Sequence, residues 1–229
     1  MKSKKIVFII CSFIFICGYA QNKFLPEDYL TKDFHKNRRE ALRTKMPSNS
    51  VAVFFTNAVR NRANDVEYVY HQDPNFYYLT GYKEPHAMVL IFKENQSIQG
   101  KTFNEVLFVQ ERNENAEMWN GTRLGVLGAQ DELGFRVAYN GSEFKSYDID
   151  FLKFDKILFK NFDNDVRDTK DNADLYDLIK TFKQKVSFDL IELNNPADDK
   201  IYNETKKRID TEFLKGAMAS LREIKTIEE

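Results

Sequence analysis

Histidine and carboxylate side chains are the groups in this sequence with the chemistry to bind a metal or transfer a proton, and their spacing argues against both roles. None of the three histidines, His35, His71 and His86, lies in an H-x-H or H-E-x-x-H pattern, so no local zinc site is predicted. Acid pairs occur in polar segments, where solvated loop carboxylates are the ordinary interpretation; they include Asp148/Asp150, Asp163/Asp165 and Asp198/Asp199. The sequence contains neither a G-x-S-x-G elbow nor a G-x-x-x-x-G-K-[ST] phosphate loop. Composition and spacing alone therefore predict a domain without an active site of its own.

The first twenty residues have the pattern of a cleaved secretory signal. Three lysines at positions 2, 4 and 5 precede an apolar run from Ile6 to Cys17, and small residues follow at Gly18 and Ala20. The run is shorter than the roughly 20 residues that a membrane-spanning helix needs. We therefore predict that residues 1–20 are a signal peptide cleaved after Ala20, and that the mature protein is secreted or periplasmic.

Two other interpretations of this segment rank lower. In a lipoprotein Cys17 would carry the lipid, but Phe15 and Ile16 are not the small residues expected before such a cysteine. A buried N-terminal strand or helix would not explain the lysines.

Cleavage would leave a mature chain that has no cysteine and is slightly acidic. Both cysteines, Cys11 and Cys17, lie in the signal segment, so neither a disulfide nor thiolate chemistry is predicted for the mature chain. It would carry 31 Lys and Arg against 35 Asp and Glu, a net charge of −4. This balance excludes a strongly basic surface for nucleic acid, and we expect no membrane attachment after cleavage.

Alternating strand and helix patterns predict an α/β fold: a mixed β-sheet flanked by helices. Short apolar runs indicate four strands, at residues 51–55, 87–92, 105–109 and 156–159. A hairpin loop is expected over residues 93–104, which makes the sheet mixed rather than purely parallel. Helical spacing indicates helices at residues 26–46, 126–133, 171–186 and 203–221, a weakly helical stretch at 142–152, and a polar break at 194–200.

Three segments of the chain together resemble a known family. The first is the pattern Q-D-x-x-F-Y-Y-L-T-G-[FY]-x-E-P, from Gln72 to Pro85, and the second is W-x-G-x-R-L-G, from Trp119 to Gly125. The third is L-R-x-I-K-x-x-E-E, from Leu221 to Glu229. Over about residues 50–229 the chain resembles the N-terminal domain of Xaa-Pro aminopeptidase, also called aminopeptidase P.

This resemblance implies a domain organisation. In the family a small α/β domain precedes a larger "pita-bread" domain, whose dinuclear metal centre, usually manganese, is built from two aspartates, a histidine and two glutamates. A metal-bridging hydroxide there attacks the peptide bond before proline. No residue of this chain matches a metal ligand, so the resemblance assigns it no cofactor. It predicts an N-terminal domain over 21–221, and residues 222–229 as the start of a linker to a catalytic domain that is missing here.

The resemblance also implies partners and an interface. The family's N-terminal domain helps to assemble a homo-oligomer, and the tryptophan that matches Trp119 can reach toward a neighbouring subunit's cleft for proline-containing peptides. The arginine that matches Arg123 lies in the same loop. These two residues are therefore our candidate substrate and interface residues, although a buried Trp119 is a competing interpretation. His71 replaces an arginine common among bacterial members, which puts the role of that position in doubt.

Two classes of function remain open from the sequence. The chain is either the non-catalytic part of a secreted Xaa-Pro aminopeptidase or a stand-alone binding or assembly module without peptidase activity. Prolidase and creatinase share this N-terminal fold and compete within the first class; the W-x-G-x-R-L-G segment favours aminopeptidase P.

Overall fold

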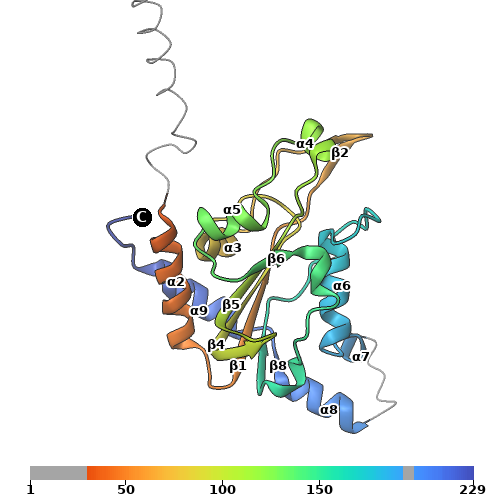
Figure 1. Cartoon of the computed structure of the whole chain (residues 1–229). Helices are drawn as coiled ribbons and strands as arrows, with labels where there is room; N and C mark the ends of the chain where they lie inside the picture. The colour runs from red at the N-terminus through yellow and green to blue at the C-terminus, as the bar shows by residue number, and fades with distance from the viewer. Residues whose placement is uncertain (1–29, 193–198) are drawn as a thin grey trace, which may run out of the picture. The chain divides into compact units, whose positions relative to one another are not determined.

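A computed structural model describes residues 30–192 and 199–229, and Thr31–Glu229 form one compact unit. Its centre is a six-stranded sheet with the order β6-β5-β4-β1-β7-β8 (Figure 1). β4 pairs antiparallel with both β1 and β5, whereas the β1–β7, β7–β8 and β5–β6 pairs are parallel. The prediction of a mixed sheet flanked by helices is confirmed.

The elements of the described chain have the following bounds. The strands are β1 (Ser50–Phe55), β2 (Asn61–Ala63), β3 (Val66–Glu67), β4 (Met88–Ile98), β5 (Lys101–Val109), β6 (Ala138–Asn140), β7 (Lys156–Leu158) and β8 (Ile209–Asp210). The α-helices are α2 (Lys32–Lys45), α3 (Pro74–Thr80), α4 (Glu114–Asn120), α5 (Gly125–Asp131), α6 (Leu175–Lys185), α7 (Asp189–Glu192), α8 (Asp199–Arg208) and α9 (Phe213–Glu223). Two 3-10 helices, η1 (Gly141–Phe144) and η2 (Phe151–Lys153), complete the list. None of the helices in the described part of the chain is long and apolar enough to cross a membrane.

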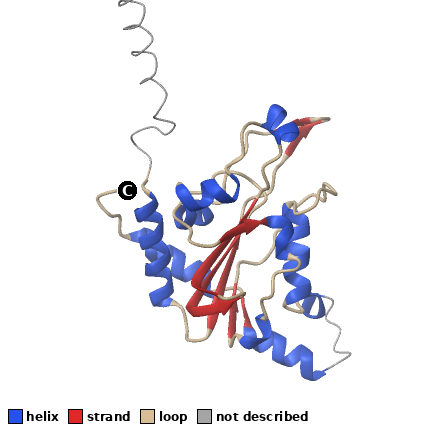
Figure 2. Ribbon diagram, in the orientation of Figure 1, coloured by secondary structure: helices blue, strands red, loops and turns tan. Residues whose placement is uncertain are grey.

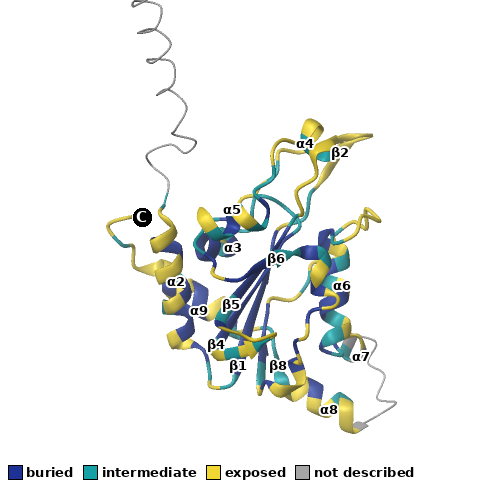
Figure 3. Ribbon diagram, viewed as in Figure 1, coloured by how far each residue is buried: buried dark blue, intermediate teal, exposed yellow. Residues whose placement is uncertain are grey.

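Helices cover both faces of the sheet, so its central strands are buried on both sides (Figures 2 and 3). On one face, side chains such as Val53, Leu90 and Phe108 form a cluster with Leu178 and Phe182 of α6. Because side chains alternate along a strand, the neighbouring positions point to the opposite face, where α2 and α3 contact β4 and β1. Burial on both faces explains the continuous apolar runs in the sequence.

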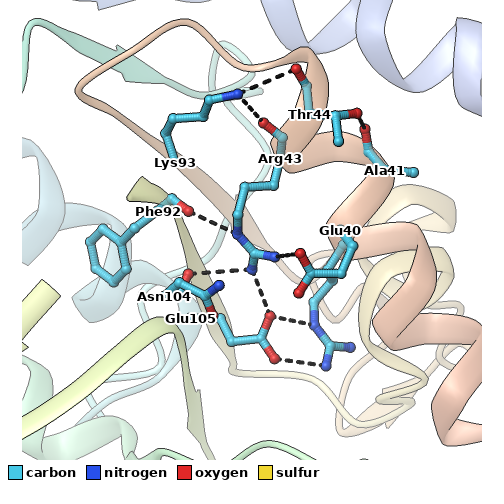
Figure 4. A network of polar contacts seen from close by, with 9 residues as sticks. Glu40, Ala41, Arg43, Thr44, Phe92, Lys93, Asn104 and Glu105 are labelled. Carbon is cyan, nitrogen blue, oxygen red and sulfur yellow. Dashed lines mark hydrogen bonds and ion pairs between the residues drawn. The ribbon is translucent and has the colours of Figure 1, made fainter. Parts of the chain in front are cut away.

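A buried charged network ties α2 to that second face (Figure 4). Glu105 of β5 accepts two hydrogen bonds from Arg39, each of 2.9 Å, and one of 2.9 Å from Arg43. The Arg39 side chain is completely buried and lies over the Phe135 ring, 4.1 Å from its centroid. Burial alone would raise the pKa of Glu105, but the hydrogen bonds and charges of Arg39 and Arg43 outweigh it and hold this pKa below its ordinary value. The carboxylate therefore stays ionised and fixes the helix on the sheet.

Three of the predicted elements differ from those in the structure. The expected helix over residues 203–221 is interrupted: α8 and α9 are separated by β8, because Ile209 pairs with Ile157 at the sheet edge. The expected loop over 93–104 is mostly strand, since β4 and β5 run to a turn at Gln99 and Gly100, both with positive φ. The predicted weak helix over 142–152 is reduced to η1 and η2.

The ends of two other predicted helices also differ. α2 begins at Lys32, where the Thr31 hydroxyl caps it by accepting from the Phe34 N–H; the predicted start at Pro26 lies outside the described residues. α6 begins at Leu175 rather than Asp171, because Asp174 supplies the capping carboxylate. The polar break predicted at 194–200 lies mostly outside the described residues.

Candidate functional site

The W-x-G-x-R-L-G motif lies in the connection between β5 and α5, which we call the Trp119 loop (residues 110–124). Its short helix α4 begins at Glu114 and is capped by Asn113, whose side chain accepts from the Ala116 N–H at 3.0 Å. Glu117 in turn accepts from the Asn113 N–H at 3.0 Å and from Arg112 at 2.7 Å. Gly121 ends α4 with a φ of 86°, a backbone conformation that glycine adopts without strain. Local capping, rather than packing, therefore forms this helix.

Trp119 lies in the last turn of α4 and is exposed. Its relative exposure is 87%, that of Met118 is 74%, and α4 contains no buried residue. Figure 3 shows α4 mostly in the colour of exposed residues. The alternative that Trp119 is a core residue of this domain is therefore wrong. Its contact with a partner subunit or substrate stays a prediction.

Arg123 closes the Trp119 loop on itself. Its Nη1 donates to the carbonyl oxygen of Glu111 at 2.9 Å, which draws the end of the loop back to its start. Two residues later Gly125 has a φ of 63°, and a Cβ there would lie 2.6 Å from the Cγ of Arg112. The second glycine of the motif is therefore required both by its backbone conformation and by the Arg112 stem that packs on it.

Glu84 brings the first two of the three sequence patterns into contact. Its Oε1 accepts from the backbone N–H of Leu124 at 2.6 Å, across 40 positions of sequence, and its Oε2 accepts from the Tyr82 hydroxyl at 3.0 Å. Tyr82 itself is only 1% exposed. Burial raises the pKa of Glu84, and the Leu124 N–H, the Tyr82 hydroxyl and the charge of Arg123 only partly oppose that shift. The sequence pattern contains this glutamate, but sequence reasoning gave it no role.

The other polar residues of the first pattern support Glu84 from behind. The Gln72 side chain donates to the carbonyl oxygen of Glu84 at 2.9 Å and accepts from the Tyr70 hydroxyl at 2.9 Å. Asp73 caps α3, because its side chain accepts from the Asn75 and Phe76 N–H groups at 2.9 Å. The aromatic segment that follows is a helix packed into the core, with Phe76 fully buried. These residues hold Glu84, and through it the end of the Trp119 loop, against the body of the domain.

The three histidines lie apart and do not form a site with Trp119. His35 is buried and its Nδ1 donates to the Tyr78 carbonyl oxygen at 3.0 Å, whereas His86 accepts from the Leu175 N–H at 3.0 Å. Burial lowers the pKa of both rings. His71 is exposed. Within residues 30–192 and 199–229, no three His, Cys, Asp or Glu side chains form a group able to hold a metal ion.

A surface pocket beside His86 is separate from the candidate residues. It is lined by Ala58, Val59, Asn61, Glu67, His86, Val166, Arg167, Thr169 and Leu175. Neither Trp119 nor Arg123 is among these residues, so this pocket does not include the candidate site.

Comparison with known proteins places the two patterns in one family. Residues 35–158 match the family described as aminopeptidase P, N-terminal domain, a range that includes Glu84, Trp119 and Arg123. The chain is 36% identical over 115 residues to the Xaa-Pro aminopeptidase of Haemophilus influenzae. It is 35% identical over 101 residues to human Xaa-Pro aminopeptidase 3. These alignments cover 50% and 43% of this chain but only 26% and 19% of the relatives.

Solved structures agree with this assignment. The chain superposes on aminopeptidase PepP of Pseudomonas aeruginosa with a TM-score of 0.57 and 25% identity, covering 73% of this chain and 34% of that one. For aminopeptidase P of E. coli with the inhibitor Pro-Leu, the TM-score is 0.54 at 27% identity, with coverages of 68% and 33%. The chain thus spans about a third of these structures, and between about a fifth and a quarter of the two curated relatives.

Proposed function

Because the chain belongs to the aminopeptidase P N-terminal domain family, we propose that it is the non-catalytic N-terminal domain of an exported Xaa-Pro aminopeptidase. Such an enzyme releases the N-terminal residue that precedes proline. The predicted signal peptide, residues 1–20, lies outside the described residues and supports the proposal of export through its charge and hydropathy pattern.

Hydrolysis is assigned to a catalytic domain that this chain would accompany. The described residues offer no group of side chains that fits a metal pair. We therefore assign the manganese pair implied by the family to that catalytic domain, and we assign no hydrolytic step to the residues described above. The role left for this domain is assembly of a homo-oligomer and control of access for proline-containing peptides.

The exposed Trp119 side chain is the observation that carries this role. Tryptophan and arginine are enriched among residues that dominate interface energetics, since a large, rigid ring buries much area at little entropic cost. Here an 87% exposed indole is presented by a capped helix in a loop that Arg123 and Glu84 hold closed. A guanidinium has five N–H donors, so Arg123 can hold Glu111 and still contact a partner.

The test uses the longer enzyme that contains this domain. Trp119→Ala is expected to raise KM for an Xaa-Pro peptide or to shift the oligomer toward smaller species in sedimentation. The matched control is Leu152→Ala in η2, another exposed apolar side chain, at 50% exposure, on a different element. Unchanged KM and unchanged assembly in the Trp119→Ala enzyme would overturn the proposed interface.

A stand-alone binding or assembly module is the second candidate. Met118 and Trp119 form an exposed apolar surface that would serve such a module equally well. The sequence downstream of codon 229 discriminates between the two: an open frame that encodes the aspartate, histidine and glutamate ligands of the family supports the enzyme.

A further inference from the structure

We propose that Glu84 is a positioning residue that fixes the orientation of the Trp119 loop from outside the loop. Its effect on the structure is independent of the enzyme; only its consequence for assembly or substrate access rests on the proposed function. Three features of the molecule lead to this assignment.

The first feature is that both ends of the Trp119 loop are attached to adjacent residues. At its start, the Gln110 side chain donates to the Pro85 carbonyl oxygen at 2.9 Å, and at its end the Leu124 N–H donates to Glu84 Oε1 at 2.6 Å. A loop whose two ends are held on one short segment moves with that segment. Of these two attachments, only the one at Leu124 uses an ionisable side chain.

The second feature is that the loop's internal bonds do not fix it to the rest of the domain. Arg123 donates to Glu111, and Arg112 pairs with Glu117; all four residues belong to the loop itself. These contacts set the shape of the loop but leave its angle to the domain free. Glu84, which precedes β4, supplies a bond from the body of the domain.

The third feature is that Glu84 is itself held in place. Its Oε2 accepts from the buried Tyr82 hydroxyl, and its carbonyl oxygen accepts from the Gln72 side chain. α5, in contrast, begins at Gly125, and its N-cap residue Leu124 makes no side-chain capping hydrogen bond. The Glu84 carboxylate therefore supplies a fixed acceptor for an N–H that would otherwise lack one.

The chain provides its own probe for this positioning, because Trp119 is its single tryptophan. Time-resolved fluorescence anisotropy, excited where tyrosine does not absorb, reports the motion of Trp119 alone. Hydrogen exchange of the 110–125 peptides reports the Leu124 N–H in the same samples. Circular dichroism shows that each variant is folded.

Three substitutions at Glu84 separate its acceptor role from simple packing. Glu84→Ala removes the acceptor, Glu84→Asp keeps the charge but is one methylene too short, and Glu84→Gln keeps an oxygen in the same place. Glu111→Ala is the control, since it removes a neighbouring exposed carboxylate but leaves the backbone carbonyl that Arg123 uses.

In Glu84→Ala and Glu84→Asp, we expect the residual anisotropy of Trp119 to fall and exchange in 110–125 to rise by roughly tenfold, the change for losing one hydrogen bond. Glu84→Gln and Glu111→Ala should behave like the wild type, and exchange in β4 and β5 should not change. If Glu84→Ala fails to fold, the result for Glu84→Asp alone decides whether Glu84 positions the loop. Wild-type anisotropy and exchange in folded Glu84→Asp would overturn the assignment.

The outcome is distinguishable from that of the proposed function. If the Trp119 loop becomes more mobile in the Glu84 variants, positioning by Glu84 is supported. If the enzyme also tolerates Trp119→Ala, the proposed interface is refuted. If the Trp119 loop keeps its wild-type mobility in the Glu84 variants, positioning by Glu84 is refuted. If the enzyme nevertheless depends on Trp119, the proposed interface is supported.

Discussion

Replacing Trp119 by alanine should leave the stability of this domain almost unchanged. Truncating a buried tryptophan to alanine costs about 3–5 kcal/mol of unfolding free energy, because the side chain leaves a cavity. Surface substitutions away from special features usually stay within about 0.5 kcal/mol. At 87% exposure, on a helix without buried residues, Trp119 belongs to the second class.

The two classes are well separated in melting temperature. For domains of this size, each kcal/mol moves Tm by about 2–4 °C. Trp119→Ala should therefore shift Tm by less than about 2 °C, whereas a loss of 3–5 kcal/mol would lower it by roughly 6–20 °C. Phe76→Ala in α3 is the matched control, because this aromatic side chain is fully buried.

Thermal unfolding followed by far-UV circular dichroism measures both variants without the tryptophan signal. We expect the Tm of Phe76→Ala to lie far below that of the wild type. The Tm of Trp119→Ala should be close to that of the wild type. A drop of more than about 6 °C in Trp119→Ala would mean that the indole packs against this domain. That result would refute the assignment of Trp119 to a free surface, and with it the interface.

Three further predictions concern activity, export and the buried charges. The purified chain, mixed with Mn²⁺ and an Xaa-Pro peptide, should release no N-terminal residue above the blank, because its described residues form no metal site; metal-dependent release would contradict this. Mass spectrometry of the exported protein should find a chain that starts at Gln21, and a mature form that retains residues 1–20 or starts at a lipidated Cys17 would show that the cleavage prediction is wrong. Glu105→Gln should cost about 3–5 kcal/mol at neutral pH, since it leaves Arg39 and Arg43 buried without their shared carboxylate. The folded pKa of Glu105 lies below its ordinary value of 4.5, so the contribution of this carboxylate is complete above that pH and is lost as the pH falls through the folded pKa. The difference in Tm between wild type and Glu105→Gln should therefore narrow in acid, and a difference that stays constant into strongly acidic pH would argue against this account.

Short-range sequence patterns predicted an element correctly where the burial of the segment and its local chemistry favour the same structure. The apolar run at residues 51–55 predicted β1, which is buried along almost its whole length because helices cover both faces of the sheet. At Asp73 a residue type that is common at helix N-caps stands before Pro74, and it does cap a helix. The two motifs were enough to identify the family, since their residues are close together in sequence.

Long-range pairing explains the elements that the sequence misplaced. Residues 203–221 have helical spacing throughout, yet Ile209 leaves the helix to extend the sheet beside Ile157. The polar residues of 93–104 indicated a loop, but cross-strand pairs such as Gln96 with Phe103 continue the hairpin. Local propensity is a weak preference, and hydrogen bonds to a neighbouring strand can override it.

The sequence by itself determined the fold class, the family and the candidate residues Trp119 and Arg123, because each depends on residues near one another in the chain. Only the tertiary structure decided that Trp119 is exposed, that Arg123 closes its own loop, and that Glu84 accepts from Leu124 forty positions away. Exposure depends on which elements cover a side chain, and a hydrogen bond depends on where a backbone N–H points. Neither property belongs to a residue type or a spacing; both arise when distant segments fold against each other.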